Sequence, residues 1–201
     1  MSRATYSAFQ KHLQFFCAPR SNPPRLTLLS GLRASVALGL DLPVALALSL
    51  GMRLLYAPFP NFLSPIYIDK IPKSKHRNQL ATAHLEKGKS EWTCTELLRL
   101  LDSSEDVDRF HAELDVGFLE RKINQAHIVG FWTMAANTQT HTATSHDVER
   151  FQQGDWQHDV AQRRRGREDV LPLWRGGPLW VGGHSWAVWM LLGVKMYEKA
   201  T

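Results

Sequence analysis

An apolar segment, Ala34–Met52 (ASVALGLDLPVALALSLGM), is the feature that most constrains the fold of this chain. A helix that crosses a bilayer needs about 20 consecutive apolar residues, and the segment approaches that length. Asp41 and Pro43 lie near its centre. A charge at the middle of a bilayer costs about 2.5–3.5 kcal/mol, and an interior proline removes a helical hydrogen bond. Two structures remain open: a helical segment or hairpin that enters one lipid leaflet, or a buried core helix kinked at Pro43.

A proline cluster and a basic stretch follow the apolar segment. The sequence LYAPFPNFLSPIYI places Pro58, Pro60 and Pro65 directly after it, and SPIYIDKIPKSKH (64–76) then ends in lysines and a histidine. This proline spacing prevents a continuous helix and forces a turn. An apolar run, a proline cluster and a cationic exit are typical of a chain that turns back at a lipid interface, so we expect membrane or droplet association through Ala34–Tyr67.

The distribution of charge also favours an anionic membrane surface as the partner. The formal net charge is +5, and residues 1–40 contain five cations and no carboxylate before Asp41. Each cation near anionic lipid contributes about 1 kcal/mol. Nucleic acid would suit a basic chain too, but no helix-turn-helix, RNP or zinc-finger pattern is visible. The sequence therefore predicts a lipid partner and no nucleic-acid partner.

Four short motifs occur in the order and spacing of a known family. They are FQKHLQFF (9–16), SGLR (30–33), the proline cluster, and SPIYIDKIPKSKH (64–76). In these motifs the chain resembles the caleosins, the calcium-binding peroxygenases of lipid droplets, as a divergent member of the fungal type. The resemblance covers roughly Tyr6–Arg77, and almost nothing beyond His76 aligns.

The resemblance implies a specific chemistry. Caleosins bind haem through two histidines, and the matching positions here are His12 and His76. Lys73 and Lys75 would pair with the haem propionates. The expected activity is oxygen transfer from a fatty acid hydroperoxide to an apolar lipid or secondary metabolite, because the pocket beside a haem decides the fate of the O–O bond. The expected location is the lipid droplet or the endoplasmic reticulum membrane, on its cytosolic face.

Each of these histidines also has an ordinary structural explanation. A histidine in a basic turn, such as His76, is more often an exposed polar residue than a ligand. His12 lies at helical spacing with Phe9, Phe15 and Phe16, which also suits a half-buried core side chain. Both explanations stay open at this stage.

The chain departs from the family in its calcium loop. After Phe16 a caleosin has an EF-hand with carboxylates at alternate positions, but this chain has CAPRSNPPRLTLLS (17–30), which contains no carboxylate. Arg20 and Arg25 would repel a cation, and Pro23 and Pro24 are unsuited to an EF loop. We therefore expect a degenerate EF-hand and no calcium.

The second half, residues 78–201, predicts further helices. Thr93 with Glu96 forms a capping-box pattern, and Asp102–Ser104 indicates a break before a longer helix from Glu105 to about Ala136. A further helix begins at Thr144 or Ser145 and runs into QRRRGRED (162–169), where cations suit a solvated helix end. The scattered histidines His141, His146 and His158 lack a convergent zinc pattern.

The C-terminal tail is rich in tryptophan and glycine. Its pattern predicts loops and then a last helix, Ser185–Tyr197, which either closes the core or contacts a membrane, since tryptophan favours membrane interfaces; the core-closing structure is favoured. In VGGHSW (181–186), two glycines before His184 permit a close approach of the backbone. His184 is the reserve candidate for haem ligation or acid–base work.

Together these features predict a mostly α protein with two regions. Residues 1–77 form the caleosin-like region: a basic arm with the degenerate EF-hand (1–33), the apolar segment (34–55), and the proline knot with its basic exit (56–77). Residues 78–201 form a helical C-terminal region. The predicted function is haem-dependent peroxygenase or monooxygenase activity without calcium regulation. The alternatives are a non-catalytic coat of membranes or lipid droplets, and a haem-free isomerase, dehydratase or cyclase using His12 or His76.

Overall fold

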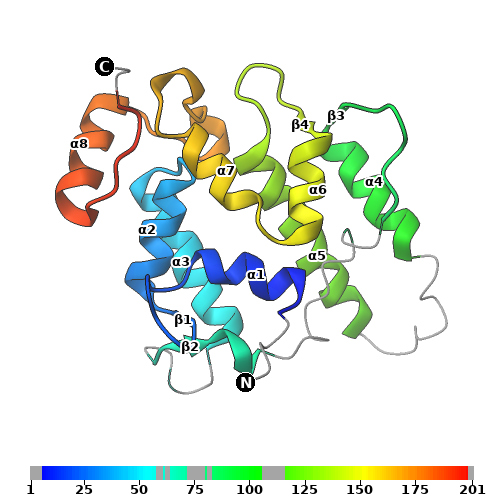
Figure 1. Cartoon of the computed structure of the whole chain (residues 1–201), viewed down its shortest axis with the longest axis horizontal. Coiled ribbons are helices and arrows are strands. Elements are labelled where there is room, and N and C mark those ends of the chain that lie inside the picture. The colour runs from blue at the N-terminus through cyan, green and yellow to red at the C-terminus, as the bar shows by residue number, and fades with distance from the viewer. Residues whose placement is uncertain are drawn as a thin grey trace.

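The chain is mostly helical, which confirms the predicted fold class (Figure 1). A computed structural model describes residues 6–57, 61, 64–71, 80, 83–105 and 116–198. Eight α-helices lie in this part of the chain: α1 (Ala8–Phe15), α2 (Leu28–Ala37), α3 (Leu42–Tyr56), α4 (Cys94–Glu105), α5 (Val116–Ala135), α6 (Ser145–Gln153), α7 (Trp156–Arg163) and α8 (Val181–Leu192).

Two short antiparallel strand pairs tie the helices together. β1 (Arg25–Leu26) pairs with β2 (Ile66–Tyr67), and β3 (Glu91–Trp92) pairs with β4 (Ala143–Thr144). Each of β1 and β4 lies in the loop between two helices, so the chain contains two helix–loop–helix units, α1–β1–α2 and α5–β4–α6. Through the β1–β2 pair, the chain that follows α3 returns to the side of the molecule on which α1 lies.

The apolar segment forms two packed helices and not one kinked helix. α2 ends at Ala37, the chain turns through Gly39 in the left-handed conformation, and α3 begins after Asp41, whose carboxylate accepts a hydrogen bond from the Leu42 amide. Pro43 occupies the first turn of α3, where its missing N–H removes no helical bond. A kink at Pro43 is therefore wrong, because the aspartate and the proline both favour a helix start.

The next prolines of the predicted knot, Pro58 and Pro60, lie outside the described residues, while Pro65 directly precedes β2. Among the residues that the structure does describe, no helix combines the length and the apolarity needed to cross a bilayer.

The chain from Thr144 forms two helices where the sequence predicts one. Thr144 caps α6 through its hydroxyl and Asp147, as expected. α6 ends at Gly154, which has a left-handed φ of 92°, and a side chain there would meet the Ala8 carbonyl of α1. α7 then runs on with Trp156 buried in the same core as Phe9. A close approach of two backbones thus divides the predicted helix.

The region around α4 is predicted correctly at its start and wrongly at its end. The Thr93–Glu96 capping box is present, with Thr93 N donating to Glu96 Oε2 at 2.8 Å. α4 continues to Glu105, through the residues expected to break it. Arg121 of α5 donates to Asp102 at 2.8 Å, and this contact between helices offsets the weak helix propensity there.

Arginines surround the carboxyl end of α5. The stretch 162–169 is mostly exposed, as expected of a solvated helix end, but Arg164 within it is buried. Arg164 is fully buried and donates to the Met134 carbonyl, while Arg163 donates to the Ala135 carbonyl at 2.8 Å. Arg175, also buried, donates to four carbonyls between Trp132 and Asn137. The last carbonyls of a helix have no partner within the helix, and these cations supply partners for them.

The last helix begins earlier than predicted, and only one of its faces closes the core. α8 spans Val181–Leu192 and not Ser185–Tyr197. Trp186 and Trp189 are 60% and 57% exposed. Gly183 lies in the first turn of α8, and its missing side chain leaves room for the ring of Trp180. The two glycines therefore serve the packing of a tryptophan at this helix start.

Candidate functional site

The candidate site lies on the inner face of α1. Ser7 and Gln10 form a capping box that begins the helix, so the apolar positions that follow at helical spacing face one side. His12 shares this buried face with Phe9, Leu13 and Phe16 and is only 2% exposed. The structure therefore places His12 deeper than the half-buried position that the sequence suggests.

The His12 ring is held by α6 and α7. Its Nε2 lies 2.8 Å from the Phe151 carbonyl oxygen, and the two side-chain rings stack at 4.7 Å between centroids. Trp156 meets the imidazole edge to face at 6.4 Å. A carbonyl only accepts hydrogen bonds, so Nε2 carries the proton and the lone pair of the neutral ring is on Nδ1.

Burial keeps this imidazole neutral. Desolvation, followed by the nearby His127 and then Lys11, lowers the pKa of His12 to about 3, although the bond to the Phe151 carbonyl opposes the shift. A ring that stays neutral through the physiological range offers a lone pair and not an acidic proton. His12 is thus suited to ligate a metal at Nδ1, and its low pKa makes it a poor proton acceptor and a poor general acid at neutral pH.

The described side chains fit one half of the expected haem site. Histidines that ligate metals usually donate their other N–H to a carbonyl or carboxylate, which fixes the ring and its tautomer. The bond from His12 Nε2–H to the Phe151 carbonyl meets that pattern. Iron would then be held through Nδ1.

The second expected ligand, His76, and its neighbours Lys73 and Lys75 lie outside the described residues. The chain leading to them is nevertheless in contact with α1. Gln10 Nε2 donates to the carbonyls of Ile68 and Ile71 at 3.3 and 3.0 Å. His76 follows Ile71 by five residues, a reach of at most about 18 Å for extended chain.

A second histidine, His127 of α5, lies beside His12 and was not predicted. The two rings are 5.7 Å apart, and the His127 ring is 5.1 Å from that of Phe9. The signal was present in the sequence, because His127 stands four residues before the buried Phe131, on the same face of a helix. The site therefore holds two imidazoles within an aromatic cluster.

The reserve candidate, His184, lies outside the site around His12. It is buried in α8, and its Nε2 lies 3.5 Å from Asp41 at the start of α3. Neither ring nitrogen makes a hydrogen bond with a described residue. Burial lowers the pKa of His184, while the Asp41 carboxylate opposes that shift. His184 touches none of the neighbours of His12 given above, so the structure does not bring the two together.

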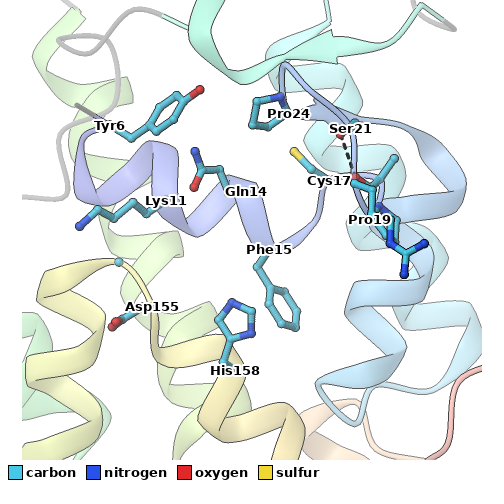
Figure 2. Close-up of a pocket in the computed structure, with 13 residues that line it drawn as sticks. Tyr6, Lys11, Gln14, Phe15, Cys17, Pro19, Ser21, Pro24, Asp155 and His158 are labelled. Atoms are coloured by element: carbon cyan, nitrogen blue, oxygen red, sulfur yellow. Dashed lines mark hydrogen bonds between the residues drawn. The ribbon is translucent and has the colours of Figure 1, made fainter. Parts of the chain in front are cut away.

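An open cleft lies along α1 (Figure 2), and His12 is not among the residues that line it. Its volume is about 770 Å³, and it is lined by Lys11 and Phe15 of α1, the loop from Cys17 to Pro24, and the start of α7. His158 meets Phe15 edge to face at 5.1 Å. Burial raises the pKa of the Cys17 thiol to about 12, so this cysteine is not a nucleophile.

The loop at the cleft makes its own hydrogen bonds. Ser21 donates to the Ala18 carbonyl at 2.8 Å and accepts from the Arg25 amide at 3.2 Å. Calcium needs six to eight oxygen ligands, most of them anionic, and this loop supplies no carboxylate.

We therefore predict that residues 17–30 bind no calcium below millimolar concentration. Titration calorimetry with calcium chloride should show no heat of site binding, because Arg20 and Arg25 add positive charge where a cation would sit. A site tighter than about 1 mM that is lost on Ser21→Ala, but not on a change in the distant α4, would contradict the prediction.

Comparisons with known proteins identify no relative of this chain. The chain matches no family model, no curated protein and no solved structure. Among the described residues no three histidine, cysteine or acidic side chains converge as a metal site. A haem iron takes only one or two protein ligands, so this last observation does not bear on the expected cofactor.

Proposed function

We propose that this chain is a divergent caleosin that binds haem through His12 and His76 and oxygenates an apolar lipid or secondary metabolite. The observation that carries the proposal is the state of His12: nearly fully buried, neutral, and fixed by a hydrogen bond from Nε2 to the Phe151 carbonyl. An apolar side chain would fill the same volume without the cost of desolvation, so a histidine at this position supports a role for its lone pair.

The order of elements in the first 71 residues also supports the resemblance. A helix, a loop with a short strand, and a second helix occupy 8–37, where the family carries its EF-hand. The Ile66–Tyr67 strand pairs with that loop, and Gln10 holds Ile68 and Ile71 against α1. This return of the chain is what His76 needs in order to approach His12.

The proposed reaction is an oxygen transfer between two lipophilic molecules. The O–O bond of a hydroperoxide breaks, the hydroperoxide is reduced to an alcohol, and an alkene acceptor takes the oxygen atom as an epoxide. Haem, when bound, supplies the chemistry of this step. His12 would orient the iron through Nδ1, and the rings of Phe151 and Trp156 keep water from the imidazole. Lys73 and Lys75 would bind the propionates.

A non-catalytic coat protein is the second candidate, and the surface of α3 favours it. Leu54 and Leu55 are 74% and 56% exposed, and Val44 and Leu46 are exposed as well. These side chains suit contact with lipid at a droplet or at the cytosolic face of the endoplasmic reticulum. If the chain binds lipid but no haem, the function that remains is droplet binding without catalysis.

The proposal predicts a Soret band that depends on two histidines. Titration of the purified chain with haemin should give a stoichiometric band in the wild type. His12→Gln, which keeps a donor for the Phe151 carbonyl but has no imidazole, should abolish or shift the band, and so should His76→Ala.

His146→Ala is the matched control, because this histidine is exposed on α6. It should leave the spectrum unchanged. An unaltered spectrum in the His12→Gln, His76→Ala double variant, with its helical circular dichroism intact, would overturn the assignment and direct the search to His127 and His184. No spectral change in the wild type would leave the haem-free alternatives.

A further inference from the structure

We propose that α8 and the turn before it form a surface that docks onto lipid. Their exposed apolar side chains, here named the tryptophan surface, are Leu179, Trp180, Trp186, Trp189, Met190 and Leu191. Each of them is more than half exposed, from 55% for Met190 to 82% for Leu179. Large apolar patches that are exposed on a protein surface mark interaction sites.

The two faces of α8 differ in burial and not in apolarity. His184, Val188 and Leu192, spaced by four residues, are buried against the rest of the chain. Trp186, Trp189 and Met190 occupy the opposite side of the helix by the same geometry. A surface helix of a water-soluble protein normally carries polar residues on its outer side, whereas the outer side here is the apolar one.

The chemistry of this surface fits lipid better than another protein. The sequence has no charged residue between Arg175 and Lys195, and the Arg175 side chain is buried. Tryptophan is enriched at the boundary of a bilayer, where its ring is buried among acyl chains and its N–H bonds a headgroup. Protein interfaces instead surround their apolar centre with a polar rim that fixes a single partner.

Two exposed cations lie next to α8 or on the neighbouring helix. Lys195 directly follows α8 and is exposed, and Arg33 is exposed on the neighbouring α2. Two carboxylates also lie here: Glu198 is 3.5 Å from Lys195, and Asp41 is 3.5 Å from His184, whose pKa is lowered by burial. Cations beside an apolar helix face are typical of elements that lie in the plane of a membrane interface.

The segments before and after α8 are hydrogen-bonded to the turn between α2 and α3, and the tryptophan surface continues onto the start of α3. The Asp41 amide donates to the Gly176 carbonyl at 2.8 Å, and the Tyr197 hydroxyl donates to the Gly39 carbonyl at 2.8 Å. Gly176 in turn lies beside Val44 of α3, which is partly exposed. α8 lies at the edge of the molecule next to the α2–α3 pair (Figure 1). A lipid surface that contacts α8 would therefore also reach part of the apolar segment.

The test is binding of the full chain to vesicles of phosphatidylcholine with an equal amount of phosphatidylglycerol. The Trp186→Ser, Trp189→Ser double variant should lower the partition coefficient at least about tenfold, since each ring buries a large apolar area. Val129→Ser, which removes an exposed apolar residue from α5, is the matched control and should not change it. The Leu54→Ser, Leu55→Ser double variant measures how much α3 contributes separately to the partition coefficient.

Quenching by brominated lipid gives an independent readout of the docking geometry. The exposed Trp186 and Trp189 should be quenched on vesicle binding. The double variant keeps the exposed Trp174 and Trp180 beside the buried Trp92 and Trp156, so its fractional quenching should be clearly smaller than that of the wild type but not zero. Equal vesicle binding by wild type and double variant, or none by either, would overturn the proposal. So would a wild-type dimer that the double variant converts to a monomer without any vesicle binding. The proposal does not depend on haem, and the Soret band should persist in the double variant.

Discussion

Acidification should destabilise the haem-free protein steeply, and His12→Gln should remove most of that loss. In the unfolded chain this histidine takes up a proton near pH 6.5, but in the fold its pKa is lowered to about 3 by burial and by the neighbouring His127. Between these two values only the unfolded state is protonated. The free energy of unfolding should then fall by about 1.4 kcal/mol per pH unit from this group alone.

The sign follows from the depressed folded pKa. The contribution of His12 is fully present above pH 6.5 and is lost as the pH falls toward 3, a total of about 3–5 kcal/mol. Urea unfolding at pH 7, 6, 5 and 4 measures it. Glutamine does not titrate and still donates to the Phe151 carbonyl, so the His12→Gln curve should be flatter than the wild-type curve.

The same substitution at the exposed His84, a residue of the loop before β3, serves as the control. Its unfolding free energy should follow the wild-type curve at every pH. Parallel curves for wild type and His12→Gln would contradict the buried, neutral state of His12 and weaken the case for a ligand at this position.

Local signals in the sequence predict where helices begin better than where they end. The capping residues Thr93 and Thr144 each act within one turn, so neighbouring residues suffice to predict these two helix starts. Asp41 and Pro43 act in the same way at the start of α3, although a kink was the expectation for a core helix there. The prediction failed at Gly154, where the cause is the approach of α1, a helix far away in the sequence. Periodicity alone carries no information about that contact.

In the candidate site, too, local signals predict some features and only the tertiary fold determines the others. The motif around His12 pointed to the residue, and helical spacing with three phenylalanines indicated an inward face. Its depth of burial depends on Phe151 and Trp156, which reach it from α6 and α7. His127 was overlooked for the same reason, since only the tertiary fold sets it against His12.

Exposure was the property that sequence predicted least well. QRRRGRED is strongly polar, yet Arg164 within it is fully buried, because helix carbonyls give a guanidinium the acceptors it needs. α8 is strongly apolar, yet its two central tryptophans face outward. In both places the hydropathy of a side chain does not determine its burial. Arg164 finds its acceptors at a helix end, and for the α8 tryptophans the lipid surface is our proposal.

Arg175→Ala should cost about 3–5 kcal/mol of the free energy of unfolding. The Arg175 guanidinium donates to the carbonyls of Trp132, Thr133, Ala136 and Asn137, and it is packed 5.2 Å from the Trp132 ring and 5.8 Å from that of Trp174. Burial, with Arg164 nearby, lowers the pKa of Arg175 only to about 10, so the group stays charged at neutral pH. Removing it leaves the end of α5 with buried acceptors that have lost their donor.

Two further variants separate the causes of this loss in urea unfolding at pH 7. Arg175→Lys keeps the cation, but an ammonium has three donors and lacks the planar fork that reaches four carbonyls, so it should recover less than half of the lost stability. Arg165→Ala removes an exposed arginine close by in the sequence and should change stability by no more than about 0.5 kcal/mol. If Arg175→Ala costs as little as Arg165→Ala, water replaces the guanidinium, and the end of α5 does not depend on Arg175. If Arg175→Ala lowers the free energy of unfolding strongly and Arg175→Lys shows the wild-type value, the stabilisation comes instead from the interaction of a cation with the helix dipole.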